Sequence, residues 1–145
     1  MSTRVLVIVF DALRPEFVTP DLMPRLSAFA AGGVRYLNSR STFLTETRVN
    51  QSAVTSGVMA AKHGLVANIF VAPDVSPETA LNTGKDEELE AAFARVGGKL
   101  FGVPTLGQIL TAAGKSYATL SAGTPGGGRL INHSAEADAT FRFAM

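Results

Sequence analysis

One stretch organises this chain: FLTETRVNQSAVTSG, which runs from residue 43 to residue 57. Its second half predicts a helix, because apolar residues recur at helical spacing and Gly57 stands where a left-handed C-terminal cap would close it. The apolar residues that share one face are Val49, Ala53 and Val54. Thr47 then lies at the helix start, where unpaired amides and the helix dipole attract anions, so its hydroxyl is a candidate nucleophile. A threonine that only caps the helix fits the same pattern.

Length and composition limit the classes of protein this chain can be. Its 145 residues, of which 46% are hydrophobic, suit one globular domain with a buried core. The net charge of +1 and the 17% of charged residues predict no broad basic face, which argues against a nucleic-acid scaffold. The chain has no cysteine, so disulfides, thiolate zinc sites and a cysteine nucleophile are excluded. Any metal must therefore be held by Asp, His and Thr.

Upstream of the central stretch, residues 4–10 (RVLVIVF) form a continuous, β-branched apolar run. This pattern predicts a strand buried on both faces of a parallel sheet. Asp11 follows directly, and in open α/β sheets ligands bind beyond the carboxyl ends of the strands, so Asp11 is a candidate metal ligand or base. An aspartate that starts a turn or caps a helix accounts for it equally well.

The same apolar run bears on location. It is too short to span a bilayer, and no small-residue cleavage site follows it. We therefore predict neither a signal peptide nor a membrane segment, and a cytoplasmic location.

The order of predicted elements indicates the fold class. A helix from Pro24 ends at Gly32 and Gly33, and residues 34–37 follow as a short strand before the helix that begins near Thr47. This β-α-β-α order predicts an α/β protein with α/β/α layers around a mostly parallel sheet.

The second half of the chain continues the alternation. We predict a surface helix over residues 86–96, a helix capped by Thr105 and a strand over residues 117–120. The glycine-rich residues 123–128 lack a phosphate-loop or dinucleotide signature and predict a flexible turn. Residues 140–145 alternate like a strand and then the chain stops, which indicates a truncated domain.

Asn68 ends a short apolar piece that follows the turn at His63 and Gly64. Its side-chain amide is a candidate donor to a bound oxyanion, although an asparagine in a loop more often serves the turn itself. His63 is better explained as a packed or capping residue than as a metal ligand.

With these residues placed, the chain resembles the alkaline phosphatase superfamily and, within it, the type I phosphodiesterase/nucleotide pyrophosphatase family. The segments that carry the resemblance are residues 7–14, 23–26, 43–57 and 63–68. The resemblance implies an alkaline phosphatase-like fold, with Asp11 as a metal ligand and Thr47 as both ligand and nucleophile. It also implies that Asn68 donates to a non-bridging phosphate oxygen, that two divalent metal ions, Zn²⁺ by expectation, are the cofactors, and that the substrate is a small phosphate ester or a nucleotide.

This sequence departs from the family's pattern at several positions. Ala12 stands where a glycine is usual, Leu44 replaces a proline, and Val49-Asn50-Gln51 replaces Pro-Asn-His. The family's later Asp and His ligands have no counterpart, so residues 1–145 are interpreted as the N-terminal part of a single catalytic domain. Two alternatives to a phosphodiesterase or pyrophosphatase stay open, namely a phosphonoacetate hydrolase-like enzyme and a non-catalytic phosphate-binding domain.

Overall fold

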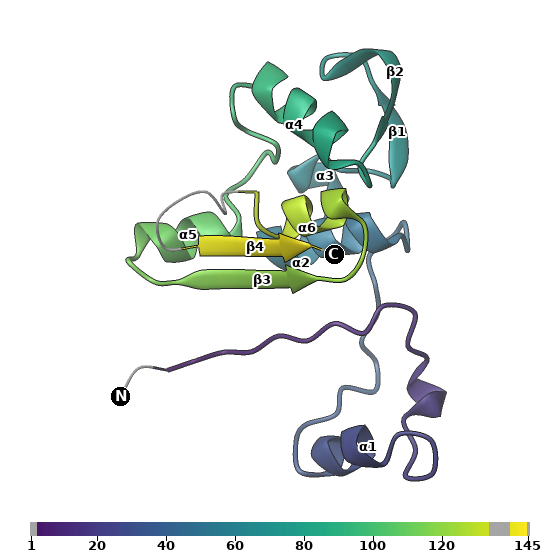
Figure 1. The fold of residues 1–145 in the computed structure, drawn as a ribbon. Helices are drawn as coiled ribbons and strands as arrows, with labels where there is room; N and C mark the ends of the chain where they lie inside the picture. Colours follow the sequence, from purple (N-terminus) through teal and green to yellow (C-terminus); the bar gives the residue numbers. More distant parts are fainter. Residues whose placement is uncertain (1–2, 134–139, 145) are drawn as a thin grey trace. The chain divides into compact units, whose positions relative to one another are not determined.

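The chain forms short helices and strands of the α/β class (Figure 1). The computed structural model describes residues 3–133 and 140–144. They lie in two compact units, Met1–Arg40 and Ser41–Met145, which are described separately below. The elements in chain order are η1 (Pro15–Phe17), α1 (Pro24–Ala31), α2 (Thr47–Ser56), α3 (Ala60–His63), β1 (Ile69–Ala72), β2 (Ser76–Asn82), α4 (Asp86–Arg95), α5 (Leu106–Ala112), β3 (Tyr117–Ser121), α6 (Pro125–Ile131) and β4 (Thr140–Ala144).

The first unit contains the predicted helix α1 but neither predicted strand. Residues 4–10 have no ladder partner among the described residues, and their apolar side chains are exposed, from 84% at Val5 to 53% at Phe10. Residues 34–37 likewise form no strand. The backbone groups of a strand need hydrogen-bond partners on a neighbouring strand, whereas those of a helix bond within the helix. The local sequence was therefore enough to predict α1 but not the two strands.

Helix α2 opens the second unit and ends as predicted, with Gly57 in the left-handed conformation at φ 70°. Its buried face differs from the predicted one: Val49, Ser52 and Thr55 are buried, and Val54 is 63% exposed. The two hydroxyls can be buried because each donates to a carbonyl, Ser52 to Arg48 across 2.8 Å and Thr55 to Ile131 across 2.9 Å.

The strands of this unit form two separate pairs. Strands β1 and β2 are antiparallel neighbours, and β3 and β4 are parallel neighbours that lie side by side in Figure 1. The described residues therefore show an α/β fold with small sheets, and they do not form the predicted mostly parallel sheet. Strand β4 confirms the alternating segment up to residue 144, and Met145 lies outside the described residues.

The glycine-rich segment is a helix, α6, and the prediction of a flexible turn is wrong. Thr124 precedes the helix and accepts a hydrogen bond from the amide of Gly127, and Pro125 occupies the first turn. The glycines let the helix lie against backbone: a Cβ on Gly126 would stand 2.3 Å from the carbonyl oxygen of Thr83. Close packing thus offsets the poor helix propensity of glycine.

The apolar core of the second unit lies between its helices. It is made by the fully or almost fully buried residues Val49, Leu65, Leu89, Phe101 and Leu130. Helix α6 is joined to α4 by an ion pair in which Arg129, nearly buried, donates to both carboxylate oxygens of Asp86 at 2.6 and 2.9 Å. Helix α6 therefore packs against both α2 and α4. None of the helices in the described part of the chain is long and apolar enough to cross a bilayer.

Candidate active site at the start of helix α2

Thr47 is the first residue of α2, and Glu46 occupies the cap position before it in an extended conformation. The Glu46 side chain makes no hydrogen bond to the helix amides. Thr47 therefore lies at the start of the helix, as the sequence predicts, and belongs to its first turn. A hydroxyl in that turn lies within the positive end of the helix dipole.

Asn68 lies beside this turn. Its side-chain Oδ1 accepts a hydrogen bond from the backbone amide of Arg48 across 3.1 Å, and its own backbone amide donates to the carboxylate of Glu46. An oxygen that faces an N–H fixes the orientation of the amide group, so Nδ2 is the atom left on the other side. The described residues give Nδ2 no hydrogen-bond partner, which leaves two N–H donors for a bound anion.

Arg48 completes the arrangement. Its Nε donates to Oγ1 of Thr83 across 2.8 Å, its Nη2 donates to the carbonyl oxygen of Asn68 across 3.2 Å, and Oγ1 of Thr83 donates to the same carbonyl across 2.7 Å. Burial lowers the pKa of Arg48, and the nearby Glu46 carboxylate opposes this. An arginine remains protonated in either case, so the site holds a fixed positive charge beside a negative one.

Within the second unit, the structure brings two predicted site residues, Thr47 and Asn68, together through the first turn of α2. Asp11 belongs to the first unit, in a turn where the amide of Leu13 donates to the carbonyl of Phe10, and Ala12 has a positive φ of 59°. The role of each residue stays a prediction.

Sequence reasoning missed Glu46, Arg48 and Thr83. The first two carried a usable signal, since they flank the predicted nucleophile with opposite charges. Thr83 carried none, because it lies in a polar loop and reaches the site only through the fold.

The residues available for a metal ion form a partial set. No cluster of three or more His, Asp and Glu side chains occurs in the described part of the chain. The oxygens of Asp11 and Thr47 suit a divalent ion, but a catalytic zinc takes three protein ligands. These two residues alone do not make a zinc site.

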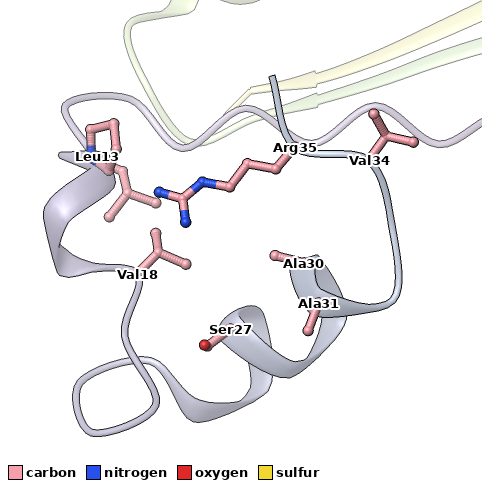
Figure 2. A pocket seen from close by; sticks show the side chains of 8 residues that line it. Leu13, Val18, Ser27, Ala30, Ala31, Val34 and Arg35 are labelled. Carbon is pink, nitrogen blue, oxygen red and sulfur yellow. The ribbon is translucent and has the colours of Figure 1, made fainter. Parts of the chain in front are cut away.

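Each unit contains a pocket. One, of about 450 Å³, is formed within the first unit, and Figure 2 shows Arg35 reaching toward Leu13 and Val18 inside it. Its other lining residues are mostly apolar. The second, of about 250 Å³, lies between β1, β2 and α4 and includes His63 in its wall. Neither pocket is lined by a predicted site residue.

A known family matches most of the chain. The sequence profile described as "Type I phosphodiesterase / nucleotide pyrophosphatase" matches residues 5–136. That range includes Asp11, Thr47 and Asn68.

Curated relatives match a shorter part. The bis(5'-adenosyl)-triphosphatase enpp4 of Xenopus laevis is 32% identical over 67 residues, which are 46% of this chain and 15% of the relative. The mouse protein of the same name is 31% identical over 67 residues, with the same coverage. The human one is 29% identical over 68 residues, 47% of this chain and 15% of the relative. The match thus spans about 15% of the length of these relatives, and no solved structure matches the chain.

Proposed function

Because the chain belongs to the type I phosphodiesterase/nucleotide pyrophosphatase family, we propose that it carries the nucleophile of a phosphodiester or pyrophosphate hydrolase. The observation that carries the proposal is the pairing of Thr47, in the first turn of α2, with an Asn68 whose Nδ2 has no partner among the described residues. One group can attack phosphorus while the other binds a phosphate oxygen. The rest of the catalytic domain, of which residues 1–145 would be the N-terminal part, belongs to the same proposal.

In the proposed reaction, Oγ of Thr47 attacks phosphorus and forms a Thr–O–P bond as the bond from phosphorus to the leaving oxygen breaks. The leaving oxygen keeps the electron pair, and the hydroxyl proton passes to solvent. Water then attacks the phosphorus of this threonine ester, the bond from phosphorus to the Thr47 oxygen breaks, and that oxygen takes up a proton from the water, which restores the Thr47 hydroxyl. Asn68 would donate from Nδ2 to a non-bridging oxygen as its charge grows, a contribution typically worth about 3 kcal/mol for one donor.

We propose Asp11 and Thr47 as ligands of divalent metal ions, two zinc ions by resemblance to the family. When bound, such ions supply positive charge to the attacking and leaving oxygens. Since two ligands fall short of a complete site, further ligands must come from other residues of the full-length product.

Substrate choice is part of the proposal. The relatives carry the name bis(5'-adenosyl)-triphosphatase, so diadenosine triphosphate is the first nucleotide substrate to test, beside bis(p-nitrophenyl) phosphate as a general phosphodiester. Phosphate release from phosphonoacetate would favour the phosphonoacetate hydrolase-like alternative. Binding of phosphate without turnover of any of the three would favour a non-catalytic domain.

The test uses the full-length gene product with Thr47→Ala, and Thr45→Ala as the matched control. Thr45 is an exposed threonine whose hydroxyl bonds with its sequence neighbours Ser41 and Thr42. We expect Thr47→Ala to lose activity by at least about a thousandfold, since removal of a nucleophile leaves only binding and electrostatic terms. Thr45→Ala should stay within about twofold of wild type, as expected for a surface residue. Full activity in Thr47→Ala would sink the proposal, and Ser52 would be the next residue to test.

A second proposal concerns the fold. We propose that residues 4–10 are a strand of a mostly parallel sheet in the complete domain, within α/β/α layers. Their exposed, β-branched apolar side chains support this, because such a run is stable in water only when covered. Slow amide exchange over residues 5–10 in the full-length product is expected, and exchange as fast as in an unfolded peptide would contradict it.

A further inference from the structure

We propose that Glu46 and Arg48, the two residues that flank Thr47 in the sequence, are positioning residues that hold Asn68 beside the Thr47 hydroxyl. We call these two residues the clamp. The inference rests on the proposed function of Thr47 and Asn68 and adds to it the means by which one chain segment is fixed against another. Neither clamp residue touches the reacting atoms in this assignment.

The clamp holds Asn68 at three points. The carboxylate of Glu46 accepts a hydrogen bond from the backbone amide of Asn68. The backbone amide of Arg48 donates to Oδ1 of Asn68, and the guanidinium of Arg48 donates to the carbonyl oxygen of Asn68. Every polar group of Asn68 except Nδ2 is thereby engaged. Rotation of the side-chain amide would break the bond to Oδ1, so the direction of the Nδ2 donors is fixed relative to the first turn of α2.

The guanidinium is itself held in a close-fitting place. Thr83 is fully buried, and its hydroxyl accepts from Nε of Arg48 while it donates to the carbonyl of Asn68. Gly84 leaves no spare room, because a Cβ there would stand 3.2 Å from Cζ of Arg48. A planar, bidentate donor in such a cradle specifies geometry in a way that a lysine cannot reproduce.

These contacts support positioning rather than direct substrate binding. Arg48 donates from Nε and Nη2 to the protein, and Nη1 faces Gly84 at 3.2 Å from the position of the absent Cβ. The two hydrogen bonds fix the guanidinium plane against Thr83 and Asn68. In this assignment Arg48 acts through Asn68, and its loss should misplace the donor. Misplacement of a catalytic group by about 1 Å can cost a hundredfold in rate.

The experiment compares Arg48→Met in the full-length product with the same change in an Asn68→Ala background, using bis(p-nitrophenyl) phosphate. Arg95→Met, an exposed arginine on α4, is the matched control. We expect Arg48→Met to lower kcat by about tenfold to a hundredfold with little change in KM. In the Asn68→Ala background it should change kcat by less than about twofold, because two residues that act as a unit are not additive. Equal losses in both backgrounds would overturn the proposal.

A second readout does not depend on activity. In substrate-free protein, amide exchange over residues 66–70 should become faster in Arg48→Met and stay at the wild-type rate in Arg95→Met. Unchanged exchange in Arg48→Met overturns the clamp.

Thr83→Val, which removes the hydroxyl and keeps the shape and the charge of the side chain, should reproduce both the loss of kcat and the faster exchange. It replaces Arg48→Met if that variant does not fold. If Thr47→Ala and Asn68→Ala are fully active, the proposed function fails, and the exchange rates alone decide the clamp.

Discussion

The backbone amide of Arg48 donates a hydrogen bond to Oδ1 of Asn68 across 3.1 Å, although twenty positions separate the two residues in the sequence. Any ordinary residue at position 48 would offer the same amide, so this bond depends on the path of the backbone at the start of α2. Only the guanidinium contacts depend on arginine. Substitutions at position 48 therefore loosen one of the contacts to Asn68 and leave another in place.

Asp11→Asn should lower the zinc content of the full-length product. The neutral amide is a much weaker ligand than the carboxylate, and Asp11 is one of the two ligands proposed here. Zinc per protein, measured after dialysis, should fall by about one ion, and phosphodiester hydrolysis should fall with it. Asp21→Asn changes another exposed carboxylate of the same unit and serves as the control. Normal zinc content and activity in Asp11→Asn would refute the ligand role.

Ala12→Gly should stabilise the protein. Ala12 has a φ of 59° in the turn that follows residues 4–10, a conformation that costs an L-residue with a Cβ about 1 to 2 kcal/mol and costs glycine almost nothing. We expect the free energy of unfolding to rise by about 0.5 to 1 kcal/mol, after allowance for the greater freedom of glycine in the unfolded chain. Urea denaturation measures it. A lower midpoint with an unchanged slope would show that this turn is not under strain.

Asp86→Ala should destabilise the second unit. The change removes the carboxylate that accepts two hydrogen bonds from the nearly buried guanidinium of Arg129. Since Asp86 is itself partly exposed, we expect a loss of about 2 to 3 kcal/mol rather than the larger values of fully buried pairs. Glu90→Ala removes an exposed carboxylate that lies 3.6 Å from Arg129. That control should cost less than about 1 kcal/mol, and an equal loss in both variants would contradict the prediction.

His63 should make stability depend on pH. It is fully buried, its Nδ1 accepts from the amide of Leu65, and burial lowers its pKa. Below about pH 6.5, the ordinary histidine value, the unfolded chain binds a proton that the folded chain does not. The stability contributed by neutral His63 is therefore complete above that pH and is lost as pH falls through the lowered pKa of the folded protein.

The measurement is the free energy of unfolding of wild type and His63→Gln at several pH values between about 5 and 8. Whatever the absolute stability of the variant, its free energy of unfolding should fall less steeply below about pH 6.5 than that of wild type. Parallel curves for the two proteins would show that protonation of His63 does not contribute.

The helices that the sequence predicted correctly carry their own start and stop signals. Helix α2 ends at a left-handed Gly57, and α5 begins with a capping box between Thr105 and Gln108. Residues 4–10 had an equally clear apolar pattern and form no strand among the described residues. The difference is physical, because a cap needs only neighbours in sequence, whereas a strand needs a partner that the pattern does not name.

The residues of the candidate site differ in the same way, since some could be predicted from neighbours in the sequence and others could not. Thr47 and Asn68 were predicted from their own segments, and the structure brings those segments together. Thr83 could not be identified, since its hydroxyl matters only after β2 has carried it next to Arg48. The helical state of residues 125–131 was also missed, because the glycines argue against a helix and the packing against Thr83 and Gly84 that offsets their poor propensity arises only in the fold.

The close approach of Gly126 to Thr83 also has a consequence for the order of events during synthesis. A ribosome completes Glu46, Arg48 and Asn68 early, but the backbone that packs against Thr83 and Gly84 follows more than forty residues later; Gly126 then donates from its amide to the carbonyl of Gly84 across 3.0 Å. At the usual pace of about 5 to 20 residues per second, that delay lasts seconds. Residues 46–84 are therefore expected to stay incompletely packed, and accessible to chaperones and proteases, until α6 has left the exit tunnel.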